Sequence, residues 1–157
     1  TPATRRNFAG NTLAVVTPAD SGLTLTTVSD LTQGAVKRIA IGNPAGVPAG
    51  RYAQGALSQA GVWPLPEGRA VYAQSVRQAL DYVARGEVEA GLVYATDALM
   101  HADKVKLAFE CATEHPIVYP MAVTSDSHHA ETAAAFVAFV AAPAGQAVLA
   151  RFGFKAP

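Results

Sequence analysis

The sequence predicts an α/β fold whose central sheet is largely parallel in its middle. Apolar strand patterns and helical patterns alternate through the middle of the chain, in the order strand, helix, strand, helix. That order favours parallel strands joined by crossover helices. The composition agrees, because 157 residues of which 50% are hydrophobic can bury one core, as a single domain or two small lobes.

The predicted strands are short, apolar and rich in β-branched residues, and turn signals bound them. Residues 28–31 form a cap and a short helical turn between the first two strands. Pro120 lies in the last strand and favours an edge or a crossing segment, because proline cannot donate to a ladder. The strands are residues 11–17, 37–42, 70–73, 90–94, 105–109 and 117–123.

Helical spacing of apolar residues begins near Ala49 and stops at Gly61. Ser75 and Gln78 form a capping box that opens a second helix, which runs up to Gly86. Further helices are predicted at residues 96–100, capped by Thr96 and Asp97, at about 130–141, and from Pro143 to Gly153.

The charge balance argues against polyanionic partners such as nucleic acids. Lys and Arg together number 12 and Asp and Glu also number 12, so the formal charge is zero. The single cysteine, Cys111, is predicted to be a small buried hydrophobe. No apolar run approaches the roughly 20 residues of a membrane span, and residues 1–6 do not resemble a signal peptide.

The turn at residues 41–53, between a predicted strand and a helix, is rich in Gly, Pro and small residues. The first N–H groups of a helix lack intrahelical partners and can bind an anion. Ala49 opens this helix, Val76 opens the capped one, and Tyr94 ends a strand. Each residue alone is an ordinary structural residue. Because ligands collect at the carboxyl ends of strands in α/β sheets, the two N–H groups and the Tyr94 hydroxyl could converge on a small oxyanion.

Other polar residues give weaker signals. Arg77 could lean over such an anion or lie at the surface as an ordinary helical arginine. His128, His129 and Glu131 are residue types that bind metals, but adjacent histidines on a turn point apart, which favours a solvated helix start. The sequence contains no set of residues that nominates a catalyst, a metal site or a cofactor site.

Several motifs occur together along the chain and make a specific combination. They are Gly42-Asn43-Pro44, Val47-Pro48-Ala49-Gly50-Arg51-Tyr52-Ala53, Ser75-Val76-Arg77-Gln78-Ala79-Leu80, Gly91-Leu92-Val93-Tyr94-Ala95-Thr96-Asp97-Ala98, Gly145-Gln146-Ala147 and Phe152-Gly153-Phe154. In these motifs the chain resembles the periplasmic molybdate-binding proteins of bacterial ABC importers, and the resemblance covers essentially its whole length.

The resemblance implies a type II periplasmic-binding fold, in which two α/β lobes close over a tetrahedral dianion. By resemblance, residues 1–10 precede the hinge, residues 11–118 form lobe two, and residues 119–157 form a return crossing strand and the C-terminal helices. The ligand contacts that carry over are the N–H groups of Ala49 and Val76 and the hydroxyl of Tyr94. The ligand would be molybdate or tungstate, with no cofactor and no cation site.

The sequence departs from this family in one respect. Two serine-bearing motifs that supply the family's other contacts do not occur here. Thr1 corresponds to a position inside the family's chain, so this sequence is expected to carry about half of the site and to expose Phe136, Phe139 and Phe152. A separate N-terminal fragment of the same protein is a further potential partner.

The function that the resemblance implies is capture of the oxyanion in the periplasm and delivery to the membrane permease of an importer, not catalysis. The alternatives are a binding protein for sulfate or phosphate, the ligand-sensing lobe of a transcription regulator, an enzyme on the same scaffold, and a remnant with no binding function.

Overall fold

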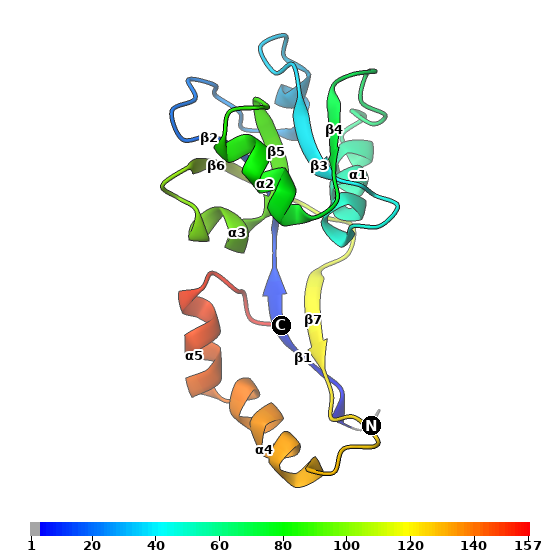
Figure 1. The fold of residues 1–157 in the computed structure, drawn as a ribbon, viewed down its shortest axis with the longest axis vertical. Coiled ribbons are helices and arrows are strands. Elements are labelled where there is room, and N and C mark those ends of the chain that lie inside the picture. The colour runs from blue at the N-terminus through cyan, green and yellow to red at the C-terminus, as the bar shows by residue number, and fades with distance from the viewer. Residues whose placement is uncertain (1–3) are drawn as a thin grey trace. The chain divides into compact units, whose positions relative to one another are not determined.

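A computed structural model describes residues 4–157, so the first three residues of the predicted 1–10 segment lie outside the described residues. The chain divides into two compact units (Figure 1). The larger unit is Thr12–His115. The smaller one combines the described residues up to Asn11 with Pro116–Pro157.

The larger unit is built on a five-stranded sheet among the described residues, in the order β4-β3-β5-β2-β6. Strand β3 is parallel to both β4 and β5, whereas β2 is antiparallel to β5 and β6. The α/β fold is therefore confirmed, but the sheet is mixed: its parallel part is β4-β3-β5, at one side of the sheet, and not the middle alone. The strands are β2 (Leu13–Pro18), β3 (Ile39–Gly42), β4 (Ala70–Ala73), β5 (Ala90–Tyr94) and β6 (Val105–Cys111).

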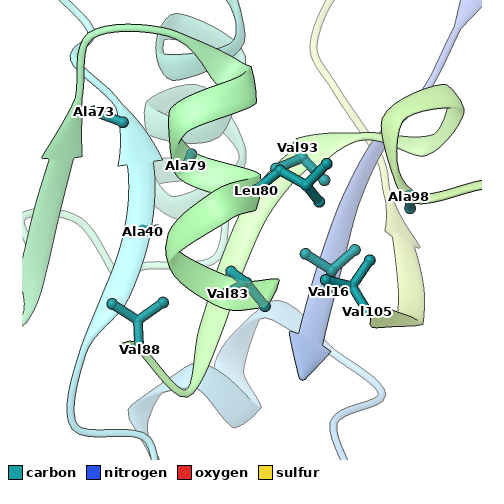
Figure 2. Close-up of a cluster of buried hydrophobic side chains, with 10 residues drawn as sticks. All are labelled: Val16, Ala40, Ala73, Ala79, Leu80, Val83, Val88, Val93, Ala98 and Val105. Atoms are coloured by element: carbon teal, nitrogen blue, oxygen red, sulfur yellow. The ribbon is translucent and has the colours of Figure 1, made fainter. Parts of the chain in front are cut away.

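Two crossover helices make the parallel connections. Helix α1 (Pro48–Gln59) joins β3 to β4, and α2 (Val76–Ala84) joins β4 to β5. Figure 2 shows α2 in front of the sheet and α1 behind it. The short helix α3 (Ala95–Met100) follows β5 directly, and a 3-10 helix, η2 (Val28–Thr32), lies between β2 and β3.

The core between α2 and the sheet consists of alanine and valine side chains with one leucine, Leu80. Gly91 on β5 lies so close to α2 that a Cβ there would be 2.6 Å from Val83 Cγ2, which indicates why this position of the strand carries no side chain. The cluster comprises Val16, Ala40, Ala73, Ala79, Leu80, Val83, Val88, Val93, Ala98 and Val105 (Figure 2). Ile39 and Ile41, which alternate with Ala40 along β3, are also fully buried.

The smaller unit pairs β1 (Arg6–Asn11) with β7 (Ile117–Met121) in an antiparallel ribbon. Pro120 therefore lies in a strand with a single partner, as predicted. Helices α4 (Ala130–Ala141) and α5 (Pro143–Arg151) follow. The Gln146 side chain donates to the Phe8 carbonyl at 2.9 Å and to the Val140 carbonyl at 2.9 Å, which ties α5 to β1 and to α4.

The two C-terminal helices present an apolar surface to solvent. Phe136, Phe139 and Phe152 are 65%, 53% and 48% exposed, which confirms the expected exposure of these side chains. Within the described residues no single helix is long and apolar enough to cross a membrane. Helices α4 and α5 meet that length and composition only as a pair bent by 63°.

Most element boundaries differ from the sequence prediction by one or two residues, and one strand was not predicted. The strand predicted at 11–17 is β2, and β1 before it was missed because polar Arg6 and Asn7 and flexible Gly10 obscure its pattern. Strand β6 continues to Cys111, which is buried as predicted, and burial raises the pKa of its thiol to about 11.

The predicted capping of α3 is right only in part: the Asp97 carboxyl accepts a hydrogen bond from the Tyr94 backbone, whereas Thr96 is not the N-cap. Tyr94, the last residue of β5, is itself the N-cap, with φ −80° and ψ 147°, and Asp97 is the third helical residue. The strand runs into the helix without a loop, because the Ala95 N–H still donates to the Thr12 carbonyl at 2.9 Å.

Candidate anion-binding site

The three predicted ligand-binding residues belong to one edge of the sheet. Strands β4, β3 and β5 are parallel neighbours, so their carboxyl ends lie at the same edge. Val76 follows β4, Ala49 follows β3 and Tyr94 ends β5. Because neighbouring strands are about 4.8 Å apart, the three strand ends span about 10 Å, which is a suitable scale for a small ligand.

Ala49 is the second residue of α1, after the N-cap Val47 and Pro48. The N–H groups of Gly50 and Arg51 donate to the Val47 carbonyl at 3.0 and 3.3 Å, and proline has no N–H. Within residues 4–157 the Ala49 N–H has no hydrogen-bond acceptor, although the residue is only 1% exposed. A donor in this state is suited to an oxyanion at the positive end of the helix.

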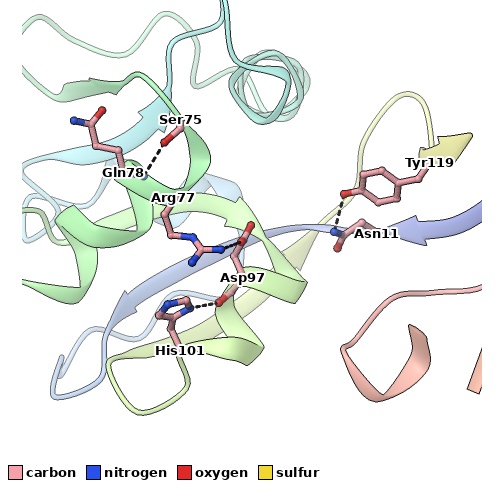
Figure 3. A network of polar contacts seen from close by, with 7 residues as sticks. All are labelled: Asn11, Ser75, Arg77, Gln78, Asp97, His101 and Tyr119. Atoms are coloured by element: carbon pink, nitrogen blue, oxygen red, sulfur yellow. Dashed lines mark hydrogen bonds and ion pairs between the residues drawn. The ribbon is translucent and has the colours of Figure 1, made fainter. Parts of the chain in front are cut away.

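Val76 is the first residue of α2, and its surroundings are fixed by a cap (Figure 3). Ser75 Oγ accepts from the Gln78 N–H at 3.1 Å, and Gln78 Oε1 accepts from the Gln74 N–H at 2.7 Å. The predicted pairing of Ser75 with Gln78 is thus present, with the return bond one residue earlier than in the standard box. In the described part of the chain the Val76 N–H has no acceptor.

Tyr94 is held by the sheet rather than by a loop. It pairs with Leu13 across the antiparallel β2–β5 ladder, and its side chain is half-buried. The residue after it is anchored to β2 through the bond from Ala95 to Thr12. Its backbone position is therefore rigid, which is what a ligand-binding hydroxyl requires.

Arg77 lies beside the Val76 N–H and forms an ion pair. Its guanidinium Nη2 is 3.8 Å from Asp97 Oδ1 on α3, and the two side chains are 62% and 15% exposed (Figure 3). Burial raises the pKa of the Asp97 carboxyl above its ordinary value, while Arg77, His101 and a hydrogen bond from the Tyr94 backbone act in the opposite direction. The sequence pattern points to Arg77 but does not indicate Asp97 as its partner.

The remaining candidates do not gather at this edge. His129 is the N-cap of α4, where His128 and Glu131 are also exposed, and no group of three or more His, Cys, Asp or Glu side chains within residues 4–157 could hold a metal ion. A hollow of about 310 Å³ lies on the flank of α1, and none of the three predicted donors lines it. It is lined by Pro48, Arg51, Tyr52, Gly55, Thr113, Glu114 and His115.

A lobe of this kind, with uncapped helix N–H groups at the carboxyl edge of parallel strands, is the architecture of type II periplasmic binding proteins. Solved structures of solute-binding proteins have the same fold as this chain. The substrate-binding domain of a putative molybdenum ABC transporter from Clostridium difficile matches 100% of this chain and 68% of its own, with 31% identity and a TM-score of 0.87. The sulfate-binding protein SubI from Mycobacterium tuberculosis shares the fold, with a TM-score of 0.79 and 20% identity.

Sequence comparison gives the family. The model of the bacterial extracellular solute-binding protein family matches residues 1–155, so the chain belongs to that family. A putative ABC transporter substrate-binding lipoprotein, YvgL, of Bacillus subtilis is 36% identical over 95% of the chain. The molybdate-binding protein ModA of Escherichia coli is 34% identical over 97% of it. The chain spans only 57% and 61% of the lengths of these two relatives.

Proposed function

We propose that this chain contributes to the capture of molybdate for an ABC importer. The observation that carries the proposal is the arrangement of Ala49, Val76 and Tyr94 after three adjacent parallel strands, at one edge of the sheet. The identity of 34% to a molybdate-binding protein, and the structural match to the domain of a molybdenum transporter, support this choice of ligand.

Binding would use neutral donors of fixed geometry. The N–H groups of Ala49 and Val76 and the Tyr94 hydroxyl would each donate to an oxygen of the dianion, aided by the positive ends of α1 and α2. Tungstate has the same charge and shape, so the same donors would accept it. Sulfate also shares charge and shape, and discrimination against it would come from the size of the cavity.

The three donors amount to about half of a ligand shell. Each hydrogen bond to a charged oxygen contributes roughly 1.5–3 kcal/mol net, and association itself costs at least about 4 kcal/mol. Three such bonds therefore give millimolar affinity or weaker by order of magnitude. We propose that residues outside this sequence supply the opposite half, as the coverage of 57% and 61% of the relatives suggests.

The site would act in the periplasm and deliver its ligand to the membrane permease of the importer, and it would bind without catalysis. Closure over the ligand would signal occupancy to the permease. Sulfate is the main competing ligand, because it shares the charge and tetrahedral shape of molybdate.

Selectivity tests the choice of ligand. Calorimetric titration of the complete two-lobed protein, in which the proposed opposite half closes the cavity, with molybdate, tungstate, sulfate and phosphate at constant ionic strength should show tighter binding of the first two. A preference for sulfate or phosphate would overturn the molybdate proposal.

A further inference from the structure

The ion pair between Arg77 and Asp97 joins the two elements that carry the Val76 and Tyr94 donors. Arg77 follows Val76 in the first turn of α2, and Asp97 lies in the first turn of α3, three residues after Tyr94. The guanidinium and carboxylate are 3.8 Å apart, and Figure 3 shows the Arg77 side chain extending from α2 to Asp97. One contact thus connects the starts of both helices.

Asp97 is also bonded to the backbone of the strand end that it follows. Its carboxyl accepts a hydrogen bond from the Tyr94 backbone, which is the return half of a capping box. Its own carbonyl lies 3.1 Å from His101 Nδ1, one turn later in α3. The carboxylate is therefore held within the first turn that begins at Tyr94, and its side chain is only 15% exposed.

A carboxylate held at this place poses an electrostatic problem for an anion site. It adds a negative charge beside the donors that must attract a dianion, and its partial burial limits screening by solvent. Neutral N–H and O–H donors have no full charge with which to offset that repulsion. A nearby cation can cancel it, and Arg77 is a cation in contact with Asp97.

We propose that Arg77 is a positioning residue that neutralises Asp97 and fixes the start of α2 against the start of α3, so that Val76 and Tyr94 can serve a dianion. This inference rests on the proposed function. In this role Arg77 contacts Asp97 and not the ligand, so it affects ligand binding only through the charge and position of Asp97. The pair keeps the edge of the sheet close to electrically neutral without removing the capping carboxylate.

The ionisable side chains that affect the pKa of Asp97 support this role for Arg77. Arg77 from α2 and His101 from α3 are the two ionisable side chains that lower the pKa of Asp97, against the effect of burial. On β6, which also packs against α3, Lys106 donates to the Ser21 carbonyl at 2.8 Å and Glu110 is exposed. Removing Arg77 should therefore raise the pKa of Asp97 further, which carboxyl NMR can measure without ligand.

The test is a titration of the chain with sodium molybdate at pH 7 and constant ionic strength. Binding is followed by the NMR signal of the Ala49 backbone amide, because Ala49 lies on a different helix from the substituted residues. Arg77→Met removes the charge but keeps most of the stem, and should weaken molybdate binding about three- to tenfold. Arg77→Met combined with Asp97→Asn should recover most of that loss, because no unpaired carboxylate remains. Arg77→Lys should stay within about twofold of the unsubstituted chain.

Arg85→Met is the matched control. Arg85 lies just after the other end of α2, is 61% exposed, and pairs with Glu87 at 3.1 Å, so its loss should leave molybdate binding unchanged. Equal binding by the chain and by Arg77→Met overturns this inference alone. If the double variant binds molybdate as weakly as Arg77→Met alone, the inference is overturned too, because a loss caused by damage to the structure would not be recovered by Asp97→Asn. Failure of the unsubstituted chain to bind molybdate overturns the proposed function, and this inference with it.

Discussion

Gly50 in α1 lies directly against Gly42 at the end of β3. A Cβ on Gly50 would stand 2.0 Å from the Gly42 carbonyl oxygen and 2.6 Å from its carbonyl carbon. This contact with backbone atoms fixes where α1 begins, and hence where the Ala49 N–H lies. We expect Gly50→Ala to lower the free energy of unfolding by about 1–3 kcal/mol, because neither backbone can give way easily.

Gly55 in the same helix provides the control for that substitution. No atom lies within 4 Å of a Cβ built there, so Gly55→Ala should raise stability by up to about 1 kcal/mol through helix propensity. Urea unfolding of both variants measures the two effects. Equal changes in both variants would contradict the role given to the contact between Gly50 and Gly42.

Val76→Pro should remove a ligand donor while leaving α2 in place. Proline is favoured at the first position of a helix, where its missing N–H has no intrahelical partner. The preceding residue, Ser75, already has the extended conformation that proline requires, with φ −155° and ψ 161°. We expect molybdate binding to weaken about tenfold or more. Val76→Ala, which keeps the N–H, should bind within about threefold of the unsubstituted chain, and a loss as large as that of the proline variant would remove Val76 from the site.

Tyr94→Phe should weaken molybdate binding about tenfold or more, because it deletes one hydroxyl donor. The aromatic ring remains, so the unfolding midpoint should change little. Tyr52→Phe is the control, since Tyr52 is also half-buried but lines the hollow on the flank of α1. If molybdate binding depended on Tyr52 and not on Tyr94, the ligand would bind in that hollow and not at the proposed site.

Asp30 gives a prediction about stability and pH. Its Oδ2 accepts from the Thr26 N–H at 2.8 Å, the Thr27 N–H at 2.9 Å and the Thr26 hydroxyl at 3.0 Å. The hydrogen bonds from the Thr26 backbone above all, then from Thr27 and the Thr26 hydroxyl, lower the pKa of Asp30 to about 2.

Because the folded pKa lies below the unfolded value of about 3.9, this carboxylate stabilises the fold above about pH 4. That contribution is lost as the pH falls toward 2. We therefore expect Asp30→Asn to be less stable than the unsubstituted chain at pH 5–7, with the difference closing between about pH 4 and 2. A difference that does not vary with pH, in urea unfolding across that range, would contradict this account.

The sequence predicted most of the fold because its local signals agree with its packing. The capping residue Ser75, the proline at 143 and Gly153 placed α2 and α5 correctly, since these residues act on the backbone beside them. Strand β1 was missed because its partner β7 is more than 100 residues away, and pairing with β7 rather than local pattern defines it.

For the candidate site, the sequence predicted the positions of the three donors but not the ion pair beside them. The placement of Ala49, Val76 and Tyr94 at strand ends followed from the alternation of strands and helices, and the structure adds that their three strands are neighbours. The partner of Arg77 could not be read from the sequence, because Asp97 lies 20 residues later and was assigned to a cap. Only the packing of α2 beside α3 shows their relationship.

The measurement that tests the central claim most directly is a two-dimensional amide NMR titration of the chain with molybdate, which can detect millimolar binding. The account predicts that the N–H signals of Ala49 and Val76 shift together and saturate as molybdate is added. Signals that shift only around Tyr52 and His115, or no saturable response at Ala49 and Val76, would contradict it.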